Sequence, residues 1–206
     1  MRIQQVLSAA VLMLVAGTVS ATDRSYFSHV QLGYTQGDFE ITVPGLGSAE
    51  EDDDGFTLDA SFLVNDNVFI AAEITKLETE DSDVEIDEMR LGVGARTRIG
   101  GNTDLFGVLQ FGKVELTIPG VGSADDDGFV ITGGASINPS PQVNLFLKAG
   151  YVLFDESDGT DLSFGVSFDV APSAALILKY RLLSLEDDFD IEYDQKGFIV
   201  GTQFQF

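Results

Sequence analysis

The chain has 206 residues, with 34 acidic residues against 11 basic ones and no cysteine. This length fits one domain, and the lack of cysteine excludes disulfides and a cysteine-linked lipid anchor. The net charge of −23 argues against nucleic acid as a partner, because phosphate binding needs clustered lysine and arginine. Mean hydropathy is nonetheless slightly positive, so charged and apolar residues must be segregated along the chain.

The first 21 residues have the layout of a secretory signal peptide. Arg2 supplies a positive start, residues 6–15 form an apolar run, and Val19, Ser20 and Ala21 make a small-residue cleavage site. The apolar run is well short of the roughly 20 residues that a membrane-spanning helix needs. We therefore expect cleavage after Ala21 and a mature domain of residues 22–206.

Ten segments of the mature chain place apolar residues at every second position, which predicts strands rather than helices. The last is the clearest, because Phe198, Val200, Phe204 and Phe206 share one face while Gln203 and Gln205 share the other. None of the ten offers a sustained stripe with the 3.6-residue helical period. In chain order, the segments are residues 30–34, 56–62, 68–74, 89–95, 105–111, 129–135, 143–151, 162–168, 176–182 and 198–204.

The connections between these segments alternate between two kinds. Four are short and rich in turn-forming residues, and five are longer and acidic. Short turns at one end and longer loops at the other are typical of outer-membrane barrels, whose turns are periplasmic. The short connections are residues 65–67, 100–102, 138–142 and 171–173, and the acidic ones are residues 50–54, 78–87, 125–127, 155–161 and 186–194.

Two of the acidic connections follow a nearly literal repeat. The sequence EITVPGLGSA at residues 40–49 reappears as ELTIPGVGSA at residues 115–124, and each copy leads into a run of acids followed by Gly-Phe. We interpret the two hairpins as copies from a duplication, which adds two strands and keeps their number even. The alternative is that a shared ligand kept both loops alike.

Lipid offers no hydrogen bonds to a peptide backbone, so strands can cross a bilayer only as a closed sheet. The sequence predicts an all-β fold, a transmembrane antiparallel up-and-down barrel of ten strands, with eight as the alternative. The C-terminal strand, carrying Phe198, Val200, Phe204 and Phe206, then closes the barrel against the first strand. A secreted β-sandwich is the soluble alternative, but its outward face would be charged, whereas the non-apolar face here is rich in glycine, serine, threonine and glutamine.

In its signal peptide, alternating strands and terminal Phe206, the chain resembles the small bacterial outer-membrane β-barrel proteins, the OmpA/OmpX-like or "porin family" group. The common small members have eight strands, against the ten expected here. The resemblance implies a Gram-negative outer-membrane location and contact with outer-membrane lipid and lipopolysaccharide. It also implies insertion by the barrel-assembly machinery through the C-terminal strand, and a monomer.

Charged residues at inward strand positions predict a cluster inside the barrel, because Arg or Lys facing lipid near the midplane would cost roughly 2–4 kcal/mol each. One interpretation is a salt-bridged plug, and the other is a narrow pore with a basic constriction. Inward phenylalanines favour the plug and inward glycines favour open space. The cluster comprises Asp59, Glu73, Glu88, Arg90, Arg96, Arg98, Lys148, Lys179 and Arg181.

Two acidic runs offer oxygen ligands of the kind that Ca²⁺ and Mg²⁺ prefer. They contain Asp52, Asp53 and Asp54 in one run and Asp155, Asp158 and Asp161 in the other. Neither run has the full spacing of a known calcium loop, so the hypothesis is weak divalent binding, against a solvated acidic surface. We expect no other cofactor.

Catalysis is not expected. The single histidine, His29, begins the first strand near the periplasmic end, far from any loop nucleophile that it would have to reach as a base. The sequence therefore predicts a non-enzymatic outer-membrane barrel with acidic extracellular loops and a structural or surface-interaction role. The alternative function is a narrow porin-like channel for ions or small solutes.

Overall fold

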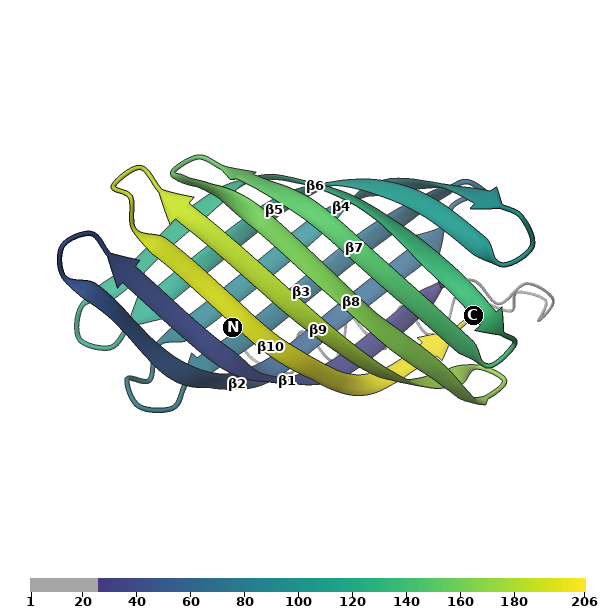
Figure 1. Cartoon of the computed structure of the whole chain (residues 1–206), viewed down its shortest axis with the longest axis horizontal. Helices are drawn as coiled ribbons and strands as arrows, with labels where there is room; N and C mark the ends of the chain where they lie inside the picture. Colours follow the sequence, from purple (N-terminus) through teal and green to yellow (C-terminus); the bar gives the residue numbers. More distant parts are fainter. Residues whose placement is uncertain (1–25) are drawn as a thin grey trace.

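Ten antiparallel strands close into one barrel in residues 26–206, the part of the chain that this computed structural model describes (Figure 1). Each strand pairs with the next along the chain, and β1 pairs with β10 to complete the barrel. The prediction of a ten-stranded barrel is confirmed, and the expected signal peptide lies outside the described residues. The strands are β1 (His29–Val43), β2 (Gly47–Leu63), β3 (Val68–Thr79), β4 (Glu85–Ile99), β5 (Thr103–Ile118), β6 (Gly122–Ser140), β7 (Val143–Phe154), β8 (Ser157–Ala171), β9 (Ala174–Asp187) and β10 (Glu192–Gln205).

The two-residue period separates an apolar outer face from a mixed inner face. Leu32, Leu91 and Val200 point outward and are each more than half exposed, at 54%, 58% and 58%. Their neighbours along the strands, Gln31, Arg90 and Ile199, point into the barrel and are buried. The inner face therefore contains both polar and apolar side chains. An apolar surface of this kind is stable only against lipid.

Aromatic rings mark both edges of the apolar band. At one edge, Tyr34 packs beside Phe56 with ring centroids 5.6 Å apart, and Tyr180 lies 4.6 Å from Phe198. At the other edge, Phe62 lies 6.2 Å from the terminal Phe206. Such rings are typical of the two membrane–water interfaces.

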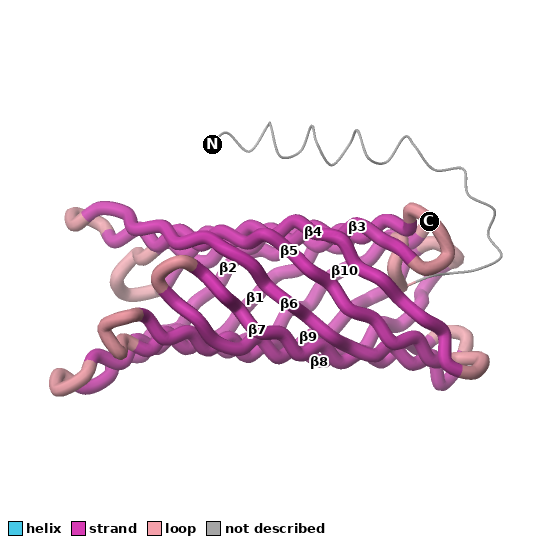
Figure 2. Tube along the Cα trace, turned by 90° about the horizontal axis from the view of Figure 1, so that it is seen from above, coloured by secondary structure: helices cyan, strands magenta, loops and turns pink. Residues whose placement is uncertain are grey.

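The four short turns and the C-terminus lie at one end of the barrel, and the five hairpin tips lie at the other (Figures 1 and 2). In the up-and-down arrangement, the end with short turns is periplasmic. No helix among residues 26–206 is long and apolar enough to cross a membrane.

The extracellular connections are shorter than the sequence predicted, and this corrects the expectation of long acidic loops. Residues 50–54 lie within β2 and residues 125–127 lie within β6, still paired to the neighbouring strand. The strands continue beyond the membrane, where water wets both faces and the apolar alternation disappears. The sequence pattern therefore ends before the backbone pairing does. The connections are residues 44–46, 80–84, 119–121, 155–156 and 188–191.

The two copies of the repeat fold into the same turn. Leu46 N donates to Val43 O at 3.1 Å, and Val121 N donates to Ile118 O at the same distance. Gly45 and Gly120 have φ values of 79° and 78°, which glycine adopts at little cost. The repeated sequence therefore builds the same turn at both tips, and the duplication stays a prediction.

Candidate functional site

The inward-facing residues stack in three layers along the barrel axis. On β9, for example, Ile177 precedes Lys179 and Arg181, and Leu183 and Leu185 follow. We name them from the periplasmic end. The aromatic layer is Tyr26, Phe27, Phe69, Phe106 and Phe146; the charged layer is Asp59, Glu73, Glu88, Arg90, Lys148, Asp161, Lys179 and Arg181; the outer apolar layer is Val130, Val152, Phe154, Leu183, Leu185 and Tyr193.

Two arginines and two carboxylates form the core of the charged layer. Arg181 from β9 contacts Glu88 from β4 at 2.7 Å and Asp161 from β8 at 2.8 Å. Arg90 contacts Asp161 at 2.6 Å and also pairs with Glu88. All four side chains are buried. The contacts cross the lumen from β4 to β8 and β9, so this network links opposite walls with balanced charge.

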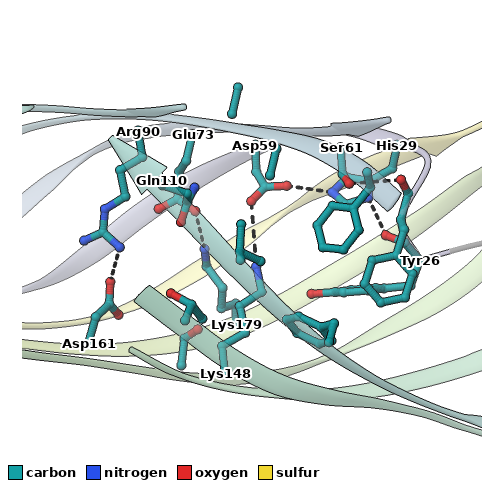
Figure 3. A pocket seen from close by; sticks show the side chains of 18 of the residues that line it. Tyr26, His29, Asp59, Ser61, Glu73, Arg90, Gln110, Lys148, Asp161 and Lys179 are labelled. Atoms are coloured by element: carbon teal, nitrogen blue, oxygen red, sulfur yellow. Dashed lines mark hydrogen bonds and ion pairs between the residues drawn. The ribbon is translucent and has the colours of Figure 1, made fainter. Parts of the chain in front are cut away.

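The remaining members of the charged layer are held more loosely. Lys179 lies 3.8 Å from Glu73, and Lys148 lies 3.9 Å from Asp59 (Figure 3). His29 approaches Asp59 at 2.6 Å through Nε2. A cavity of about 60 Å³ lies among these groups. That volume has room for a few water molecules, and side chains of both the charged and the aromatic layers line it.

The inward glycines at the level of the aromatic layer make room for its rings. A Cβ on Gly94 would lie 2.2 Å from the Phe69 ring, and one on Gly134 would lie 2.4 Å from the Phe106 ring. In both cases the glycine is the direct cross-strand partner of the phenylalanine. The sequence analysis treated inward phenylalanines and glycines as opposing signals. The structure shows that they are two halves of one packing arrangement, which fills the lumen.

The residues just before β1 fold into the barrel and complete the aromatic layer. Phe27 is 2% exposed and packs against Phe69 and Phe106, at centroid distances of 4.9 and 5.3 Å. Tyr26 packs against Phe146 at 5.3 Å, and its carbonyl oxygen lies 2.7 Å from His29 Nδ1. Sequence reasoning missed this segment. Its only signal is the adjacent Tyr-Phe pair in an otherwise polar stretch before the first strand.

Two of the predicted lumen residues lie near the periplasmic mouth, apart from the charged layer. Arg96 lies over the Phe27 ring at 5.1 Å and 3.7 Å from Asp104. Arg98 lies 3.4 Å from the same carboxylate, with 44% of its side chain exposed. Asp104 and Asp161 were not in the predicted cluster. The sequence analysis had assigned Asp161 to an acidic extracellular connection. The other seven predicted residues meet in the charged layer.

The acidic residues proposed to bind divalent cations do not converge. Asp53 points into the barrel while Asp52 and Asp54 alternate to the outer face, and Asp161 belongs to the charged layer. Within residues 26–206, no group of three His, Cys, Asp or Glu residues is arranged to hold a metal ion.

Asp53 is a deeply buried carboxylate above the membrane, and it accepts a hydrogen bond from the Gln195 amide at 3.4 Å rather than from a basic side chain. It lies three residues beyond the Phe56 girdle and is 1% exposed. The pKa of Asp53 is raised to about 6, mainly by burial; a hydrogen bond from Gln195 opposes the shift, and the charges of Asp38, Asp54 and Asp52 add to it. This carboxyl therefore titrates near neutral pH.

The C-terminal strand has the position predicted for it. Phe198, Val200, Phe204 and Phe206 all lie on the lipid face and are exposed. The register of β10 against β1 runs from His29 opposite Gln205 to Thr42 opposite Glu192. The terminal aromatic side chains thus lie on the seam where the barrel closes.

Comparison with known proteins identifies the family. The model of the outer membrane protein beta-barrel domain matches residues 9–169, which is more than half of the chain. The chain belongs to this outer-membrane β-barrel family. Its location is therefore the bacterial outer membrane. No curated protein matches the chain in sequence.

Several solved structures are similar to this chain. The outer membrane protease OmpT from Escherichia coli is 11% identical, with 91% of this chain and 100% of that chain covered and a TM-score of 0.50. The translocator domain of the autotransporter NalP from Neisseria meningitidis is 13% identical, with 98% and 94% covered and a TM-score of 0.49. Neisserial surface protein A is 14% identical, with 86% and 96% covered and a TM-score of 0.46. At these identities the likeness concerns the fold alone.

Proposed function

We propose that this protein is a closed, non-catalytic outer-membrane barrel that acts in a structural or surface-interaction role through the acidic strand extensions at its extracellular end. The observation that carries the proposal is the buried network of Glu88, Arg90, Asp161 and Arg181, which links opposite walls of the lumen. A barrel whose interior is cross-linked in this way leaves its outer rim as the surface available to partners.

The balanced charge of this layer argues against an anion-selective pore. Its members are four acids and four bases, so the basic residues that suggested a constriction are matched by carboxylates. The aromatic layer adds a second barrier on the periplasmic side. An ion would have to part buried pairs, and breaking such a pair costs several kcal/mol in proteins.

Planar-bilayer recording of the purified protein tests this proposal. We expect no stable conductance steps beyond those of bilayers that receive detergent alone. The same preparation must migrate as folded protein on SDS gels without heating, so that silence reflects a closed barrel and not a failed insertion. Stable, large conductance from the folded protein would contradict the proposal.

A narrow channel remains the second candidate, favoured by the cavity of about 60 Å³ between the charged and aromatic layers. The variant Phe27→Ala discriminates between the two, because it enlarges this space without changing any charge. If the aromatic layer is the only barrier to conduction, this variant should conduct ions. If the charged layer closes the barrel independently, the variant stays silent.

Non-catalysis rests on the surroundings of the single histidine. His29 is 4% exposed, is held between Asp59 and the Tyr26 carbonyl, and lies at the periplasmic end. Its two ring nitrogens contact a backbone carbonyl and a carboxylate rather than a hydroxyl nucleophile. The protease activity named for OmpT is accordingly not proposed for this chain.

For partners, we propose outer-membrane lipid, including lipopolysaccharide, with weakly bound Ca²⁺ or Mg²⁺ bridging the acidic rim to lipid phosphates. Export through the signal peptide, insertion by the assembly machinery through the C-terminal strand, and a monomeric state complete the proposal. Calorimetric titration with millimolar CaCl₂ tests the cation: heat is expected for the wild type, and its absence would remove this part.

A further inference from the structure

A second cavity lies at the periplasmic end of the lumen, below the aromatic layer. Its volume is about 180 Å³, and its walls include Tyr26, Asn138, Gln142, Asn144, Asp169 and Gln205. Tyr26 lines both this cavity and the central one. The cavity is independent of the extracellular rim on which the proposed function depends.

Two irregularities in strand pairing lie beside this cavity. The β6–β7 register shifts between Ile137 and Ser140, and the β8–β9 register shifts between Asp169 and Ala171. An extra residue in one strand bends it locally and redirects its side chains. Here the shifts occur where Asn138, Ser140 and Asp169 line the cavity. The local bends in β6 and β8 therefore form part of the cavity wall.

A buried amide oxygen in the wall of this cavity lacks a protein partner. Asn144 is 8% exposed, and its Nδ2 donates to Ser136 Oγ at 2.6 Å and to Asn138 Oδ1 at 3.0 Å, yet its Oδ1 has no protein partner. Buried polar groups normally find a hydrogen-bond partner. The wall of the cavity therefore contains one unpaired acceptor, Asn144 Oδ1, among further amide and hydroxyl groups.

The charge of the walls limits the class of guest. No basic side chain lines this cavity among the described residues, so it offers no site for an anion. Asp169 is the single carboxylate in the lining, too few for a divalent cation, which takes several oxygen ligands. What remains is amides, hydroxyls and the phenol of Tyr26, which are suited to a neutral molecule that both donates and accepts hydrogen bonds.

The size of the cavity limits the guest further. An engineered protein cavity of about 150 Å³ binds benzene, so about 180 Å³ accommodates one six-membered ring. We propose that this vestibule is a binding site for a neutral polyhydroxylated molecule of the size of one sugar ring, reached from the periplasmic side. The ring hydroxyls would pair with Asn144 Oδ1 and the neighbouring amides.

Titration of the folded, ¹⁵N-labelled protein in detergent micelles with D-glucose tests the proposal by NMR. Saturable shifts are expected in the side-chain amides of Asn138, Asn144 and Gln205, with a dissociation constant in the millimolar range. The variant Asn144→Ala should weaken binding at least tenfold, while the control Gln36→Ala, on the outer face near the opposite rim, should bind as the wild type does.

Sodium phosphate and glucosamine hydrochloride serve as charged probes and should give no saturable shift at these amides. The proposal is overturned if D-glucose gives only linear shifts, which would indicate a vestibule that holds water alone. It is also overturned if folded Asn144→Ala binds like the wild type. Unheated gel mobility shows whether each variant is folded. Because the site lies at the periplasmic end, these results leave the test of conductance unaffected.

Discussion

The charged and aromatic layers fill the same lumen by different chemistry. In the charged layer, Arg181 holds Glu88 and Asp161 at 2.7 and 2.8 Å, so its members depend on one another's charge. In the aromatic layer, Phe69 and Phe106 occupy the space left by Gly94 and Gly134, so its members depend on shape. The comparison shows that side chains in one lumen can be held together by neutralised charge or by rings packed over glycines. Substitutions should therefore affect the two layers differently.

The largest effect is expected for Arg181→Ala in the charged layer. This change leaves Glu88 and Asp161 buried with Arg90 as the one remaining arginine, and breaking a buried pair costs roughly 3–5 kcal/mol. Urea unfolding in detergent or lipid vesicles measures the loss of unfolding free energy. Circular dichroism follows the transition, because the chain has no tryptophan to report it by fluorescence. The exposed pair of Lys196 and Glu50, at 3.6 Å, provides the control, since Lys196→Ala should cost about 0–1 kcal/mol. Equal effects of the two variants would contradict the account of this layer.

A smaller effect is expected for Gly94→Ala in the aromatic layer. The added Cβ meets the Phe69 ring at 2.2 Å, and overpacking of this kind costs typically about 1–3 kcal/mol. The cost should disappear in a Phe69→Ala background, because the ring that the methyl group meets is gone. A double-mutant cycle of unfolding free energies measures this coupling. Additive costs would show that the ring and the glycine are not partners.

Asp53 sharpens the comparison, because it is a buried carboxylate without the arginines that serve the charged layer. Its folded-state pKa of about 6 lies above its ordinary value of 3.8. The protonated carboxyl therefore favours the folded barrel, and this stability is lost as the pH rises from about 4 through about 6. Unfolding measured from pH 4 to 8 should show this decline in the wild type and a weaker decline in Asp53→Asn. The exposed Asp81→Asn should follow the wild type, and an identical pH profile for Asp53→Asn would contradict the assignment.

The membrane-spanning part of the fold could be predicted because lipid imposes a two-residue period. Leu32, Leu91 and Val200 face lipid as that period requires, and Phe206 lies on the closing seam. The strand extensions could not be predicted in the same way, since water wets both faces beyond the girdles. The sequence pattern therefore predicts a loop at residues 50–54, although they are paired with β1.

The candidate site could be predicted only in part. Strand parity placed Arg90, Arg181 and Glu88 in the lumen, because each follows from its own strand. Asp161 was missed as a lumen residue because it follows an acidic run that resembles a loop. The pairing of Phe69 with Gly94 depends on the register between strands, which one sequence does not contain. The inward fold of Tyr26 and Phe27 leaves no periodic pattern.

Thiol accessibility tests the central claim, a closed lumen, most directly. The chain has no cysteine, so a single one can be placed with Ser163→Cys, which is 5% exposed and lines the central cavity between the two layers. A charged, membrane-impermeant thiol reagent added outside intact cells should leave this residue unlabelled while it labels the control Ser123→Cys on the exposed β5–β6 hairpin. Labelling of both cysteines at similar rates would mean that the lumen is open from outside, and the account would be wrong.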